Sequence, residues 1–208
     1  MIKTTSLTAL ILMSVFLLSV LIHESGHALI AKSVGYNIDK IYIFPGYQLY
    51  PKFGDEFIGE WPHGQIAFTQ IRSDIIFKSI PTKEQIELLE NSWQPALIQL
   101  MGSGLTWLVS VICLITLRFL KPWSILFYLM LVGSVFYYDI VFYVIFPYYF
   151  EVPHMVFWGG YPSEPVAALS KLGLDMGLSA GLILLICSIQ TIYLARFIYD
   201  CRPRNTMP

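Results

Sequence analysis

The sequence has little charge and few cysteine or histidine residues. Only 13% of its 208 residues are charged and the formal net charge is −1, which predicts no nucleic-acid partner. The three cysteines (Cys113, Cys187 and Cys201) are too few and too scattered for a disulfide framework. Four histidines are too few for a membrane di-metal oxygenase. The absence of a repeated pair of interrupted apolar segments argues against a transporter.

Apolar residues are abundant instead: 56% of the chain is hydrophobic and 15% is aromatic, far more than in a soluble domain of this length. Four apolar runs of about 20 or more residues predict membrane-spanning helices near residues 6–31, 93–117, 123–146 and 174–198. The expected fold is therefore an all-α, multi-pass integral membrane protein. We expect one polytopic membrane domain over residues 1–208, in contact with the lipid bilayer.

The segment between the first two spans, residues 36–92, differs in composition from the rest. Apolar and polar residues alternate over Lys40–Phe44 and over Gly64–Thr69, which predicts short β-strands separated by turns. Residues Lys83–Asn91 have the composition of a surface helix. A small strand-bearing insertion outside the membrane is therefore expected.

The connection Arg118–Pro122 is so short that the second and third spans must be antiparallel neighbours. Four spans then place the amino and carboxyl termini on the same side of the membrane. Basic residues are denser on that side, which predicts that it is cytoplasmic; they are Lys3, Arg118, Lys121, Arg196, Arg202 and Arg204. The sequence makes no prediction about a homo-oligomer.

A His-Glu-x-x-His pattern, His23 to His27, closes the first apolar run. Residues four apart share one face of a helix, so His23 and His27 are predicted to bind one Zn²⁺ ion per chain. Glu24 is then the predicted general base, which takes a proton from a zinc-bound water. The alternative is that these polar residues merely face headgroup water. Ionisable groups inside an apolar segment are costly, which favours the metal site.

Zinc in a catalytic site needs a third protein ligand, and Asp139 is the candidate favoured by depth. His23 lies eight residues before the predicted end of the first span at Ala31, and Asp139 lies eight residues before Pro147 at the end of the third. Both spans run towards the same face, so both side chains should lie roughly 12 Å inside it. The alternatives for Asp139 are a neutral carboxyl or one hydrogen-bonded to a tyrosine.

Other candidate ligands have no such depth argument. His63 and His154 lie in predicted loops beside proline. Glu164 is expected in the first turn of a short helix through Leu169, and Asp175 at the start of the fourth span. Either acid remains an alternative third ligand.

Small residues occur in the second span at Met101–Gly104, at about the depth of the histidines. Such residues allow close helix packing, and here they would also leave room for a substrate backbone. Ser103 or Thr106 is a candidate donor to the oxyanion. Gly177 and Gly181 form a similar small-residue pair in the fourth span.

With His23-Glu24-Ser25-Gly26-His27 in the first span and a lone acid in the third, the chain resembles the site-2 protease family of intramembrane zinc metalloproteases. The resemblance implies a three-helix catalytic core, zinc bound by His23, His27 and an acid on a later helix, and Glu24 as base. It also implies that the strands of the 36–70 segment pair with an unwound substrate.

The predicted function is therefore that of a zinc metalloendopeptidase. It would hydrolyse peptide bonds within or next to a transmembrane segment of a membrane-protein substrate. The alternative is a non-proteolytic membrane protein that keeps a structural or regulatory metal site and binds partner helices. The two differ in whether Glu24 is required.

Overall fold

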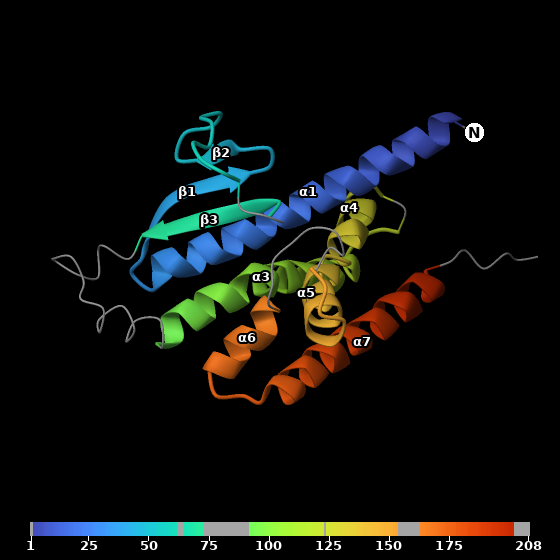
Figure 1. The fold of residues 1–208 in the computed structure, drawn as a ribbon. Helices are drawn as coiled ribbons and strands as arrows, with labels where there is room; N and C mark the ends of the chain where they lie inside the picture. Colours follow the sequence, from blue (N-terminus) through green and yellow to red (C-terminus); the bar gives the residue numbers. More distant parts are fainter. Residues whose placement is uncertain (1, 62–64, 73–91, 123, 154–162, 202–208) are drawn as a thin grey trace, which may run out of the picture.

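The computed structural model describes residues 2–61, 65–72, 92–122, 124–153 and 163–201 (Figure 1). His63, His154 and the helix expected over Lys83–Asn91 lie outside these ranges. The helices are α1 (Ile2–Ser33), α3 (Trp93–Leu117), α4 (Ile125–Gly133), α5 (Tyr138–Val144), α6 (Glu164–Lys171) and α7 (Met176–Asp200). The strands are β1 (Asn37–Ile43), β2 (Tyr47–Tyr50) and β3 (Ala67–Arg72), and a π-helical turn, η1 (Ile145–Tyr149), follows α5.

The predicted fold class is confirmed. Within the part of the chain that the structure describes, four segments are long and apolar enough to cross a membrane: Thr8–Ser33, Trp93–Leu117, Ile125–Tyr149 and Met176–Asp200. A three-stranded sheet follows the first of them. The sidedness of the termini and the single-domain organisation remain predictions.

The third span is interrupted, a feature that hydropathy did not predict. Helix α4 ends at Gly133, and tight turns precede α5. The Ser134 carbonyl at this interruption accepts a hydrogen bond from Ser110 Oγ of α3 at 2.6 Å, and Ser110 Oγ in turn accepts one from Gln190 Nε2 of α7 at 2.6 Å. Side chains of two other spans thus satisfy polar groups at the break, as an apolar environment requires.

Helix α3 lies alongside the C-terminal half of α1 (Figure 1). The two backbones approach closely at Gly26: a Cβ atom there would overlap the Met101 carbonyl oxygen and lie 2.8 Å from its carbon. A residue without a side chain at position 26 therefore allows α3 to pack directly against the face of α1 that carries His23 and His27.

The sheet has the strand order β2-β1-β3 and is antiparallel throughout. Strands β1 and β3 confirm the two predicted strands, and β2 is additional. The sheet folds back along the C-terminal half of α1, with β3 next to the helices (Figure 1). In this register Ile41 is opposite Thr69 and Ile43 is opposite Ala67. An edge strand is thereby placed against the His-Glu motif.

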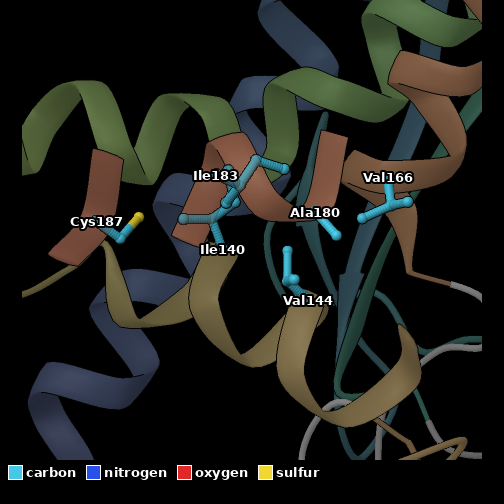
Figure 2. Close-up of a cluster of buried hydrophobic side chains, with 6 residues drawn as sticks. All are labelled: Ile140, Val144, Val166, Ala180, Ile183 and Cys187. Atoms are coloured by element: carbon cyan, nitrogen blue, oxygen red, sulfur yellow. The ribbon is translucent and has the colours of Figure 1, made fainter. Parts of the chain in front are cut away.

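A buried apolar cluster joins α5, α6 and α7 (Figure 2). Burial of these side chains stabilises the packing of the three helices, because each contributes apolar area removed from solvent. The cluster consists of Ile140 and Val144 from α5, Val166 from α6, and Ala180, Ile183 and Cys187 from α7. It fixes α5 and α6 relative to one another, and with them Asp139 and Glu164.

Candidate metal centre

The two histidines of α1 face one another across one helical turn. Their Nε2 atoms are 3.0 Å apart, and the side chains are 7% and 14% exposed for His23 and His27. The ring of Tyr143 stacks on His23, with centroids 5.4 Å apart. The imidazoles are therefore held on one face of α1, as the four-residue spacing predicts.

The other ring nitrogen of each histidine contacts a hydrogen-bond acceptor. His23 Nδ1 is 2.8 Å from Asp139 Oδ2, and His27 Nδ1 is 2.8 Å from the Ile98 carbonyl oxygen. Since a carboxylate and a carbonyl only accept, each Nδ1 must carry the proton. In the neutral imidazoles both Nε2 atoms then present lone pairs towards each other.

Glu164, the first residue of α6, brings a third acceptor to the same point. Its Oε2 atom is 3.5 Å from His23 Nε2 and 3.6 Å from His27 Nε2. This oxygen is buried and has no hydrogen-bond partner among the described residues. Three acceptors that converge without a donor between them repel one another unless a cation binds between them.

The distances between these three atoms fit zinc. Bonds of about 2.0–2.2 Å to nitrogen and oxygen in tetrahedral geometry separate ligand atoms by roughly 3.3–3.6 Å; the two separations from Glu164 Oε2 fall in this range, and the two Nε2 atoms are slightly closer, at 3.0 Å. Among the described residues, the ligand atoms of His23, His27 and Glu164 all lie within 4.8 Å of one another. The donor set of two imidazoles and one carboxylate is also one that catalytic zinc uses.

The environment of Glu164 favours its ionised form. Burial of the carboxyl acts to raise its pKa, but the nearby imidazoles of His23 and His27 outweigh burial and lower the pKa below its ordinary value. The carboxylate is the form that binds metal ions.

Gly102 of α3 leaves room for this centre. A Cβ atom at position 102 would lie 2.6 Å from His23 Nε2 and closer still to His27 Nε2. The backbone of α3 thus closes one side of the site without a side chain. This is a more specific role than the close helix packing expected of a small residue.

Asp139 is placed beside His23, in agreement with the matched depths, but on Nδ1 rather than on the side of the Nε2 atoms. Its Oδ2 atom also accepts a hydrogen bond from Thr106 Oγ1 at 3.1 Å, and the same hydroxyl is 2.7 Å from the Ser103 carbonyl oxygen. Thr106 has one hydroxyl proton, which the Ser103 carbonyl and the Asp139 carboxylate share. The ligand role of Asp139 stays a prediction, and Glu164 competes with it for that role.

Glu24 is buried, with 7% of its surface exposed. Thr69 Oγ1 of strand β3 donates a hydrogen bond to Glu24 Oε2 at 2.7 Å. Both residues line a cavity of about 440 Å³, together with His23, His27 and Glu164. The proposed base, the three acceptors and the edge strand thus share one cavity.

The contributions of Glu164, Thr69 and Gly102 were missed or left open by sequence reasoning. The sequence predicts helix α6, but this helix is too short to cross the membrane. The depth of Glu164 in the membrane therefore cannot be found by counting residues from the end of a span. Gly102 stood out only as a small residue. Thr69 carried no distinguishing signal within a predicted strand.

Comparison with known proteins identifies the family of this chain. The sequence model of peptidase family M50 matches residues 11–200, which include all the residues of the centre. No curated protein and no solved structure matches the chain. Because the match covers most of the 208 residues, the chain belongs to peptidase family M50, the site-2 protease family of membrane metalloproteases.

Proposed function

We propose that this chain is an intramembrane zinc endopeptidase in which His23, His27 and Glu164 bind one Zn²⁺ ion. The observation that carries the proposal is the convergence of two unprotonated Nε2 atoms and one unpartnered carboxylate oxygen. Family membership supports the metallopeptidase class. The substrates proposed are membrane proteins cleaved within or next to a transmembrane segment.

A zinc ion with these three ligands would lower the pKa of a bound water and polarise the scissile carbonyl. Glu24 follows His23 directly and its carboxylate lines the same cavity. It is placed to accept a proton from the attacking water and later to deliver it to the leaving amine.

Asp139 has a different role in this proposal from the one expected of it. By accepting the His23 Nδ1–H, it fixes the tautomer in which Nε2 is free to bind metal, and it orients the ring. Thr106 in turn orients the carboxylate. Asp139 is thus proposed as a residue that positions a ligand.

The substrate is proposed to reach the cavity as an extended segment. A peptide bond within a helix is shielded by its own turn, so a transmembrane substrate must unwind locally. Strand β3 is at the edge of the described sheet, and Ala67, Phe68 and Thr69 line the cavity. An unwound segment that adds to this edge would form backbone hydrogen bonds beside the centre.

Glu24→Gln tests the function. We would purify the full chain in detergent and measure zinc content and cleavage of quenched fluorogenic peptides, each an apolar segment of about 20 residues. We expect the wild type to cleave at least one peptide, and Glu24→Gln to retain zinc and lose cleavage by at least about 100-fold.

Two outcomes would contradict the proposal. Cleavage that persists in Glu24→Gln at full zinc content would show that Glu24 is not the base. A wild-type chain that binds zinc but cleaves none of the peptides would favour a non-proteolytic protein with a structural or regulatory metal site. Asp200→Asn, which changes an exposed acid at the end of α7, is the matched control and should behave as wild type.

A further inference from the structure

The hydroxyl of Thr69 joins two parts of the chain that are far apart in sequence. It lies 2.7 Å from Glu24 Oε2 and 3.3 Å from the Glu24 carbonyl oxygen. A hydroxyl has one proton, and the shorter distance together with the negative charge of the carboxylate favours donation to Oε2. Strand β3 therefore makes a direct polar contact with the proposed base.

This contact restricts a flexible side chain. A glutamate has several rotatable bonds, and a base must hold its free oxygen within hydrogen-bond distance of the water that it deprotonates. When Thr69 binds Oε2, the other carboxylate oxygen remains to accept the proton. Hydrogen bonds to charged groups are among the stronger ones in proteins, so one such bond is enough to select a rotamer.

The position of Thr69 within the sheet adds a second consequence. Its neighbours Ala67 and Phe68 line the same cavity, and β3 is the strand proposed to receive the substrate. A segment that pairs with β3 would hold this strand in place, and with it the donor to Glu24. Substrate binding and orientation of the base would then depend on one strand.

We propose that Thr69 is a positioning residue for catalysis, whose hydroxyl holds the Glu24 carboxylate in its reactive orientation and links it to the substrate-binding edge strand. This role rests on the proposed peptidase function. The alternative is a purely structural role, in which the β-branched side chain of Thr69 stabilises β3 and its hydroxyl has no part in catalysis. The two roles differ in whether the hydroxyl or the shape of the side chain matters.

Three variants of the full chain separate these roles. Thr69→Val keeps the branched shape and removes the hydroxyl, whereas Thr69→Ser keeps the hydroxyl and removes the methyl group. Thr116→Val in α3 makes the same change at a threonine that does not line the cavity and whose hydroxyl bonds its own helix. For each, kcat and KM on the same fluorogenic peptides, zinc content and thermal unfolding would be measured.

We expect Thr69→Val to lower kcat by about 10- to 100-fold with little change in KM and full zinc content. Thr69→Ser should retain kcat within about threefold, and Thr116→Val should match the wild type. The proposal is overturned if Thr69→Val keeps the wild-type kcat, if only KM changes, or if Thr69→Ser is as impaired as Thr69→Val. A wild-type chain that binds zinc but cleaves no peptide overturns the proposed function itself, which is a distinct result.

Discussion

His23 Nδ1 lies 2.8 Å from Asp139 Oδ2, on the opposite side of the imidazole ring from the Nε2 atom that faces His27 and Glu164. One ring thus contacts two carboxylates through two different nitrogens. In the proposed centre the nitrogen contacted separates the roles of the two acids, because Glu164 is on the Nε2 side, where it would share a metal ion with His27.

Asp139→Ala tests the orienting role. Without its acceptor, the proton of His23 can move to Nε2 and block the metal-binding nitrogen, so we expect zinc affinity to fall by about 10- to 100-fold. Competition with a chelator measures the change. Thr106→Val removes only one donor to the Asp139 carboxylate and should have a smaller effect. An affinity of Asp139→Ala equal to that of the wild type would contradict the orienting role.

Gly102→Ala tests the space beside the centre. Its Cβ atom would lie 2.6 Å from His23 Nε2, so the histidines must shift and zinc should be largely lost. Alanine has a higher helix propensity than glycine, so α3 should remain helical in this variant. Its circular dichroism spectrum should therefore match that of the wild type. Gly104→Ala is the matched control, because its Cβ would meet only the flexible end of Met101, at 3.1 Å. Equal zinc content in the two variants would argue against the predicted centre.

Gly26→Ala tests the contact between α1 and α3. The new methyl group would overlap the Met101 carbonyl, and overpacking of this kind costs about 1–3 kcal/mol. Thermal unfolding in detergent should therefore begin at a lower temperature. Gly181→Ala in α7 has nothing within 4 Å of its Cβ and should be neutral or slightly stabilising. Comparable losses in both variants would mean that close packing at Gly26 is not the cause.

Ser110→Ala tests the interruption of the third span. It would leave the buried Ser134 carbonyl and the Gln190 amide without their observed partner, which should destabilise the fold by about 1–3 kcal/mol. Thr116→Ala in the same helix removes an exposed hydroxyl bonded to its own helix and should change stability by less than about 0.5 kcal/mol. Unfolding in detergent, followed by tryptophan fluorescence, compares the two. Similar stability would show that the bridge to Ser134 contributes little.

Much of this architecture could be predicted from periodicity and length. The apolar runs predict the four spans, and the alternation of apolar and polar residues predicts strands β1 and β3. Both patterns reflect which residues contact solvent, lipid or protein. The matched depths of His23 and Asp139 also placed these residues together correctly. A count of residues along a helix gives height in the membrane, however, and cannot tell which ring nitrogen a carboxylate will reach.

Other features depend on contacts that no local pattern records. Glu164 reaches the histidines because α6 packs on α5 and α7 through Val166, and a short helix outside the four spans has no depth to count. Hydropathy does not predict the interruption after Gly133, because the residues there are as apolar as those of an uninterrupted membrane-spanning helix. Thr69 reaches Glu24 only because the sheet folds back along α1.

The identity of the third ligand is the central claim, and zinc content per chain tests it most directly. Purified wild type, Glu164→Ala and Asp139→Ala would be equilibrated with excess zinc, dialysed and analysed for metal. We predict one zinc ion in the wild type, near-complete loss in Glu164→Ala, and partial or full retention in Asp139→Ala. Full zinc content in Glu164→Ala together with loss in Asp139→Ala would contradict the account and make Asp139 the ligand.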